Sequence, residues 1–409
     1  MNKKIGWIRF SGLIIGPILG SGIILLPTMV YEKAGFWSLP AWVLISVLGL
    51  FFAFIFSFLT LLFPGEAGVS NAIEYVFGKR VKILSAGYLI GAGLFGPVAV
   101  LLIAERYANL SGLLSSTTFT LISLLLCTCL LMMSITSIGR AALVLSSVAA
   151  ILLVSGGAMA LIYHSKFDVV RQPFEFSVFG NAMLLLFWGL VGWEVIGSFS
   201  GEIKDPKHTY TKAALFSAFI ITTVSLVVAG AVQFADIDSL GSPVADVAMI
   251  IKPIAGGLNT YVFGGLVFAL CINTYLSFVG SIARLAASLA DDNILPRVLN
   301  RRTKNNSAYI LIAIMTLVHV FQILLVKIGL MTMESLVAVA DVFFLLNALV
   351  GLLAAMVIFE RRWLKICTGV LAACFFSILL FSSSLLLVTI SLISFFVLFA
   401  GRPYLTVAD

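Results

Sequence analysis

Long runs of apolar residues are the feature that most restricts what this chain can fold into. Of its 409 residues, 61% are hydrophobic and only 11% are charged, whereas a soluble domain carries about 25% charged residues. The runs are about twenty residues long, the length that a helix needs to cross the hydrocarbon core of a bilayer. Since backbone polar groups in lipid must be bonded internally, the runs predict helices rather than open strands. We therefore expect an all-α polytopic membrane protein.

The spacing of the runs predicts twelve membrane-spanning helices in a single membrane domain, residues 1–409. Most Lys and Arg residues fall in loops on the side of the N-terminus, so the positive-inside rule places both termini in the cytoplasm. A polar segment at 64–82 predicts a short interfacial helix. The predicted spans are 8–31, 38–63, 83–110, 117–138, 141–163, 178–200, 212–234, 258–289, 308–328, 334–358, 363–381 and 384–400.

Composition and spacing exclude several other classes of protein. The net charge of +7 comes from residues scattered between apolar runs, and these form no face that could bind nucleic acid. The five cysteines show neither metal-site spacing nor a secreted disulfide pattern. The stretch "GAGLFG", Gly91–Gly96, matches a dinucleotide fingerprint, but no strand precedes it, so we expect it to serve helix packing. No nucleophile has an adjacent base, so we expect no enzyme activity, no metal and no cofactor.

Two spans are interrupted by small residues. The first contains Gly16-Pro17 and Gly20-Ser21-Gly22, and the sixth contains "FWGLVGWEVIG" at 187–197. The two lie five spans apart, which predicts a first repeat at 8–163 (spans 1–5), an inverted repeat at 178–358 (spans 6–10), and two further spans at 363–400. Broken helices at matching positions of inverted halves point to a transporter's substrate site. The alternative is that the glycines serve only close packing.

A broken membrane helix exposes backbone groups that can bind a small zwitterion. The N–H groups that start its second half, together with the positive end of the helix dipole, would bind a carboxylate. Carbonyls freed at both breaks would accept hydrogen bonds from an ammonium group, so the site would hold an α-amino acid. The donors are Ser21, Gly22 and Ile23, and the acceptors are Pro17, Ile18, Leu19, Trp188, Gly189 and Val191. Because the donor at Ser21 belongs to the backbone, Ser21→Ala should be tolerated.

Ionisable residues at membrane depth are candidates for function. Glu194 lies beside the break in the sixth span, where it is either a group that binds and releases a proton or a protonated structural residue. Asp341 lies nearer the outer end of its span, and His319 is typical of a packed histidine. We expect Arg284 to anchor the inner end of its span by reaching the interface or pairing there.

Four stretches resemble motifs of the amino acid–polyamine–organocation transporters, in the family's order and over about residues 8–300. The first corresponds to the family's glycine motif and proline in span 1, and the second to its segment after span 2. The third corresponds to the broken span 6 and its acidic cytoplasmic end, and the fourth to the cytoplasmic end of span 8. They read "GSGIILLP", "PGEAGVSNAIEYVFG", "FWGLVGWEVIGSFSGEIKDPKHTYTKA" and "IARLAASLADDNILPRVLNR".

This resemblance implies the LeuT-type fold, a 5+5 inverted repeat within twelve transmembrane helices, with helices 1 and 6 broken. It also implies roles for single residues. Ser21 and Gly22 would donate to the substrate carboxylate. The carbonyls of Ile18, Trp188 and Val191 would accept from the substrate amino group. Trp188 would also be an aromatic gate, Phe278 would line the pocket, and Glu194 would match the family's glutamate after the break.

The expected function is secondary-active transport of a neutral, apolar L-amino acid by alternating access across a bacterial inner membrane. The overall look is similar to the branch that exports methionine and branched-chain amino acids, so efflux or exchange is expected. Some members carry a lysine in span 5 where sodium-coupled relatives bind sodium; here Ser146 and Ser147 stand nearby, so proton or sodium coupling stays open, as does a monomer or homodimer. The alternatives are a cationic amino acid or polyamine transporter of the same superfamily, a non-transporting membrane sensor or scaffold, and a channel.

Overall fold

The computed structural model describes residues 5–65, 67–109, 114–133, 135–166, 171–193, 203–236 and 246–381. Within these ranges the regular structure is helical. The α-helices are α1 Trp7–Leu19, α2 Gly22–Ala34, α3 Ser38–Leu62, α4 Val69–Phe77, α5 Lys79–Ala108, α6 Ser116–Leu131, α7 Ile135–Tyr163, α8 Phe176–Phe187, α9 Pro206–Phe234, α11 Val247–Ala255, α12 Asn259–Asp291, α13 Tyr309–Lys327, α14 Met333–Ile358 and α15 Arg362–Phe381. Short 3-10 helices are η1 Gly35–Trp37, η2 Trp188–Leu190, η4 Gly256–Leu258 and η5 Arg297–Asn300.

The helices fall where the apolar runs predict membrane spans. Eight helical segments are long and apolar enough to cross a membrane, and the first of them, Trp7–Leu62, runs through α1, α2 and α3. Two shorter apolar helices, Ser116–Leu131 and Phe176–Leu190, occupy the predicted fourth and sixth spans. Each predicted span from 8–31 to 363–381 overlaps a described helix. The twelfth, 384–400, lies outside the described residues, so the number twelve and the inverted repeat stay predictions.

The boundary between the fourth and fifth spans was wrong. The fourth span was expected to continue to residue 138, but α6 ends at Leu131 and α7 begins at Ile135. The apolar run continues through the turn, so hydropathy gives no signal for it. Side chains from the loop before α13 bond the last carbonyls of α6: Ser307 Oγ donates to Leu131 O at 2.9 Å, and Asn305 Nδ2 donates to Met132 O at 2.8 Å.

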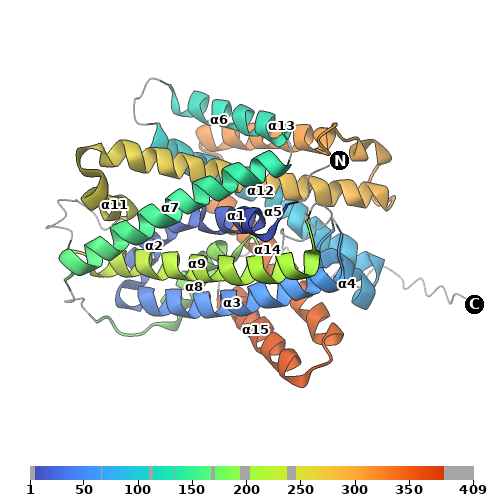
Figure 1. Ribbon diagram of the computed structural model, residues 1–409, viewed down its shortest axis with the longest axis horizontal. Helices are drawn as coiled ribbons and strands as arrows, with labels where there is room; N and C mark the ends of the chain where they lie inside the picture. The colour runs from blue at the N-terminus through green and yellow to red at the C-terminus, as the bar shows by residue number, and fades with distance from the viewer. Residues whose placement is uncertain are drawn as a thin grey trace, which may run out of the picture.

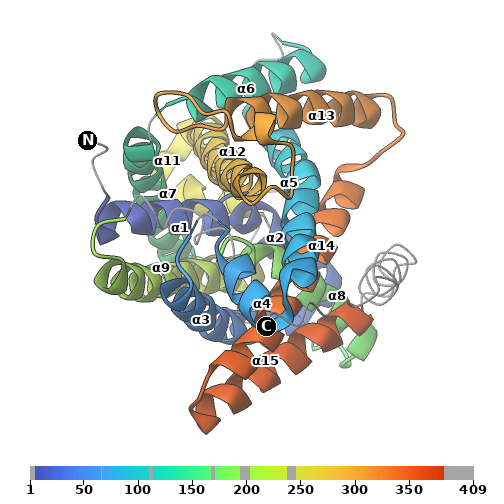
Figure 2. The same cartoon turned by 90° about the vertical axis from the view of Figure 1, so that its right-hand side faces the viewer.

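α1 lies in the centre of the bundle and contacts α7, α9 and α12. α5 packs along α12 and α14, while α6 and α13 cover one side and α15 crosses the opposite side (Figure 2). α3 and α9 run side by side along the long axis of the molecule (Figure 1). Small residues permit this close packing, since a Cβ at Gly12 of α1 would lie 2.5 Å from Cα of Leu143 on α7.

Two short helices lie between the long ones. α4 falls within the predicted interfacial segment 64–82 and packs on α5 and α14. Lys82 of α5 joins α4 to the end of α12, because its Nζ donates to Glu74 Oε2 and to Asp292 Oδ2, both at 2.7 Å. α11 was not anticipated from the sequence, where its nine residues are too few for a span. It begins at a cap in which Asp246 Oδ1 accepts from the Met249 N–H at 2.9 Å.

Candidate functional site

The first span is broken between α1 and α2. Pro17 lies inside α1, where it removes a backbone donor and favours a kink. Gly20 leaves the helix with φ −7° and ψ −124°, and α2 begins at Gly22. The N–H groups at the start of a helix have no acceptor in their own helix. The predicted donors of Ser21, Gly22 and Ile23 therefore belong to the amino end of α2, where the helix dipole favours an anion.

The sixth span is broken after α8. The chain continues as η2, and Val191 is extended with φ −65° and ψ 126°. Gly192 follows with φ +136°, a conformation that favours glycine. A Cβ on Gly192 would also lie 2.7 Å from Ile18 Cγ1, so the backbone of this break packs directly on the Ile18 side chain in the last turn of α1. The two interruptions are thus in contact, while the shared substrate site stays a prediction.

Trp188 connects the breaks through its side chain. Its indole Nε1 donates to Ser21 Oγ at 3.3 Å. A Cβ on Gly22 would lie 3.4 Å from Trp188 Cδ1, and a Cβ on Gly96 of α5 would lie 3.2 Å from Trp188 Cη2. The indole therefore extends from the amino end of α2 to α5 and is buried there. Its role as an aromatic gate stays a prediction.

The remaining predicted site residues differ in how closely they approach the breaks. Ile23 is buried in the first turn of α2, and Val191 is buried after η2. Phe278 is buried on α12, where its ring centre lies 5.5 Å from that of Phe344 on α14, so its role as a pocket wall stays a prediction. Glu194 lies outside the described residues, and its role in proton coupling also stays a prediction.

Asn273 and Thr274 of α12 hold the last turns of α1, a role that the sequence analysis missed. Thr274 Oγ1 donates to Gly16 O at 3.3 Å, and Asn273 Nδ2 donates to Ser146 Oγ of α7 at 3.4 Å. A Cβ on Gly16 would lie 1.9 Å from Asn273 Nδ2. The available signal was an adjacent pair of polar residues in the middle of an apolar span, which is uncommon unless they bond to other helices.

Three other ionisable residues, His319, Arg284 and Asp341, lie within the helix bundle. His319 of α13 is fully buried, and its Nδ1 lies 2.8 Å from the Tyr275 hydroxyl while its Nε2 lies 3.1 Å from Gly93 O. It packs three helices together, as predicted. Arg284 Nη1 donates to Gly280 O of its own helix at 3.0 Å. Asp341 is buried on α14 beside Ala340, whose Cβ would lie 3.4 Å from a Cβ on Gly96.

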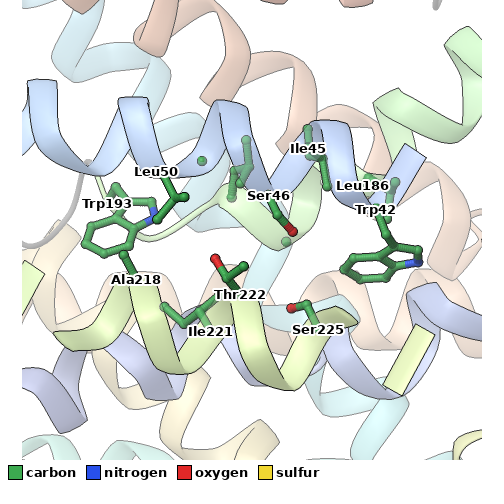
Figure 3. A pocket seen from close by; sticks show the side chains of 13 residues that line it. Trp42, Ile45, Ser46, Leu50, Leu186, Trp193, Ala218, Ile221, Thr222 and Ser225 are labelled. Carbon is green, nitrogen blue, oxygen red and sulfur yellow. The ribbon is translucent and has the colours of Figure 1, made fainter. Parts of the chain in front are cut away.

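A cavity of about 30 Å³ lies behind the second break, between α3, η2 and α9. Figure 3 shows the hydroxyls of Ser46, Thr222 and Ser225 directed into the space between α3 and α9. Trp42 Nε1 also belongs to this wall and is buried without a hydrogen-bond partner among the described residues. A cavity of this size can hold a water molecule where polar groups such as these hydroxyls bond it. The backbone of the second break borders this cavity through Gly189 and Leu190.

The amino-acid sequence is similar to those of known membrane transport proteins. The amino acid permease family model matches residues 5–405. The uncharacterised amino acid permease YecA of Bacillus subtilis is 24% identical over 304 residues, covering 72% of this chain and 71% of YecA. The L-methionine/branched-chain amino acid exporter YjeH of Escherichia coli is 24% identical over 394 residues, covering 89% of this chain and 88% of YjeH. The putrescine transporter PotE of Escherichia coli is 25% identical over 320 residues, covering 74% and 71%.

A solved structure supports the same fold. A manganese transporter of Eremococcus coleocola superposes with a TM-score of 0.63 at 12% identity, covering 97% of this chain and 92% of that one. Such low identity shows the fold alone. The relatives are permeases, exporters and transporters, and the apolar helices fit a multi-pass membrane protein. Since the family model covers nearly the whole sequence, the chain belongs to the amino acid permease family of membrane transporters.

Proposed function

We propose that this protein is a secondary-active transporter of neutral, apolar L-amino acids that works by alternating access, in the direction of efflux or exchange. The observation that carries the proposal is the contact between the two broken spans. Trp188 donates to Ser21 across the breaks at 3.3 Å, and Gly192 lies against Ile18. This contact supports a site in which backbone donors from one break and backbone acceptors from the other bind the two charged groups of an α-amino acid.

In this site the substrate carboxylate accepts from the N–H groups of Ser21, Gly22 and Ile23. The ammonium group donates to freed carbonyls of Ile18, Trp188 and Val191. The substrate side chain then lies against Trp188 and extends toward Phe278. Of the described side chains at the breaks, those of Ile18, Ser21 and Trp188 are not ionisable, while Glu194 beside the second break lies outside the described residues. A neutral apolar side chain on the substrate matches these surroundings, because a charged one would lack a counter-ion there.

The similarity to an exporter of methionine and branched-chain amino acids supports this substrate class. One observation favours a second candidate, a cationic amino acid or polyamine. Asp341 is a buried carboxylate, and its neighbour Ala340 packs near Gly96, which also contacts Trp188. The similarity to a putrescine transporter agrees with that reading. The two candidates predict opposite responses to Asp341→Asn, because only a cationic substrate would lose a counter-ion.

The family relation and the charge distribution support a location in a bacterial inner membrane with both termini in the cytoplasm. Glu194, next to the second break, is our candidate for a residue that exchanges a proton during transport. Residues 140–157 of the fifth span contain no lysine, the residue that some members carry where sodium-coupled relatives bind sodium, so this span leaves sodium coupling open beside proton coupling. A matched pair of transport assays, with a proton gradient or with a sodium gradient, separates these two couplings.

Counterflow of labelled amino acids in proteoliposomes tests the function. Saturable counterflow of methionine, leucine, isoleucine or valine is expected, with half-saturation that Asp341→Asn leaves unchanged. Loss of all amino-acid counterflow in a protein that still unfolds cooperatively would refute the proposal. Putrescine or lysine counterflow that Asp341→Asn abolishes would replace it with the second candidate.

Gly22→Val tests the site itself. A Cβ on Gly22 would meet Trp188 Cδ1 at 3.4 Å, an ordinary contact, so the methyl groups of valine extend into the space where the carboxylate approaches the backbone. We expect counterflow to be lost. The matched control is Gly87→Val, at a helical glycine with open space around it, which should transport normally. Normal counterflow by Gly22→Val would assign the first break to packing alone.

A further inference from the structure

A deep apolar groove runs between α3 and α9, apart from the two breaks. Its volume is about 350 Å³. Its floor is formed by small residues, among them Ala53, Ala214 and Ala218, all of which are buried. Its walls are large side chains, of which Phe54, Leu215 and Phe219 are 44%, 65% and 66% exposed. Both helices belong to membrane-crossing segments, so the groove opens toward lipid.

The groove is as long as one leaflet of the bilayer is deep. On α3 it extends from Leu61 to Leu50, and on α9 from Thr211 to Thr223. Each stretch is about eleven residues, or ~16 Å at the rise of an α-helix. One leaflet supplies about half of the ~30 Å hydrocarbon core. Because α9 starts at Pro206 on the side that the charge distribution places in the cytoplasm, the groove lies in the cytoplasmic half.

Positive charge is concentrated at the cytoplasmic end of the groove. Lys212 directly follows Thr211, which lines this end, and its side chain is exposed. Lys204 lies exposed just before α9. The nearby acid Asp205 bonds His208 Nδ1 through its Oδ2 at 2.8 Å. The combination of a long apolar slot with an exposed cation at its interfacial end is complementary to a fatty chain attached to an anionic headgroup.

We propose that this groove binds one acyl chain of an anionic phospholipid from the cytoplasmic leaflet, with the lipid phosphate at Lys212. The deep end of the groove shares Leu50, Ala218 and Thr222 with the cavity behind the second break (Figure 3). The far wall of that cavity includes Gly189 and Leu190. The end of the acyl chain thus covers the membrane side of the cavity. This site goes beyond the proposed function and does not depend on which substrate is carried.

Photo-crosslinking in proteoliposomes tests the lipid site. The probe is phosphatidylglycerol with a diazirine at the end of one acyl chain, present at low mole fraction in phosphatidylcholine. Crosslinks are expected to concentrate on Leu50, Ala218 or Thr222. Ser57→Phe places a ring in the groove from its partly exposed wall and should remove these crosslinks. The matched control, Ile151→Phe, alters an exposed apolar position of α7 and should leave them unchanged.

Lys212→Gln tests the headgroup contact. Competition with unlabelled phosphatidylglycerol should be stronger than with phosphatidylcholine of the same chains, and Lys212→Gln should reduce this preference about five-fold, as expected for one lysine near an anionic surface. Lys365→Gln, an exposed cytoplasmic-side lysine on α15, is the control. Equal competition by both lipids in the unaltered protein would overturn the headgroup assignment.

Two other results would overturn the groove as a lipid site. Crosslinks spread evenly over the exposed faces of α3, α6, α7 and α9 of the unaltered protein would show ordinary lipid contact without a site. Crosslinks between two copies of the chain at groove residues, obtained with a zero-length reagent, would show that a second copy fills it. Both outcomes are readable even if Ser57→Phe lowers stability, because they are measured on the unaltered protein.

Discussion

Replacing Ser21 with alanine tests whether the Trp188 indole is held over the amino end of α2 by its hydrogen bond. From the sequence, Ser21→Ala should be tolerated, because the donor to the carboxylate is the backbone N–H. The structure gives the hydroxyl a second role, since Ser21 Oγ accepts from Trp188 Nε1 at 3.3 Å. This distance is at the long end for such a bond. Its loss should therefore cost about 1 kcal/mol of substrate binding, or about a five-fold weaker affinity.

Trp188→Phe removes the same bond and also the contact between the outer indole ring and Gly96. We expect this variant to lose about 2 kcal/mol, because a packing contact goes with the hydrogen bond. The double variant should then bind substrate no more weakly than Trp188→Phe alone. The expected coupling energy between the two positions is about 1 kcal/mol.

The assay is ligand-dependent thermal stabilisation of the purified protein, with counterflow half-saturation as the second readout. Stabilisation by a bound ligand follows mass action, so it reports affinity. Ser123→Ala is the control: Ser123 is a buried serine whose hydroxyl bonds Phe119 O of its own helix, and its loss should leave affinity unchanged. Effects of Ser21→Ala and Trp188→Phe that add within about 0.5 kcal/mol would refute the link.

Three further changes test other contacts. Gly16→Ala would place a Cβ 1.9 Å from Asn273 Nδ2, so thermal unfolding should show that the free energy of unfolding falls by about 1–3 kcal/mol. Adding Asn273→Ala should restore part of this stability, and a double variant with no recovery would contradict the clash. Lys82→Met leaves Glu74 and Asp292 without their shared cation. Because these carboxylates are 39% and 45% exposed, we expect the free energy of unfolding to fall by only about 1–2 kcal/mol in a chemical unfolding curve. The control, Lys79→Met, should leave it unchanged. Glu194→Gln should make the transport rate independent of pH, and an unchanged pH profile would assign the residue to structure.

Local chemistry made the helices and their interruptions predictable. Apolar run length located the spans, and the glycines and proline at 16–22 located the first break at Gly20-Ser21, because only the local backbone decides where a helix can stop. Gly192 likewise indicated the second break, and its φ of +136° confirms that the helix is interrupted there. Backbone features of this kind depend on nearby residues alone.

Contacts between helices were not predictable in the same way. The bond from Trp188 to Ser21, the packing of Asn273 on Gly16, and the bridge from Lys82 to Asp292 depend on how the helices are rotated and offset. Hydropathy carries no information on the rotation or the offset of a helix. Lys82 shows the difference: the positive-inside rule counted it as an interfacial charge, whereas its side chain is buried between two carboxylates.

His319 has a consequence for the route of protons through the molecule. Its two partners fix the tautomer, since Gly93 O can only accept, so Nε2 carries the hydrogen and Nδ1 accepts from the Tyr275 hydroxyl. The ring therefore has no nitrogen left with which to pass a proton onward unless a bond between helices is first broken. The histidine therefore transfers no proton between α5, α12 and α13 while both of its hydrogen bonds are formed. A proton can pass between these helices by way of His319 only after the contact of α13 with α5 or with α12 is broken.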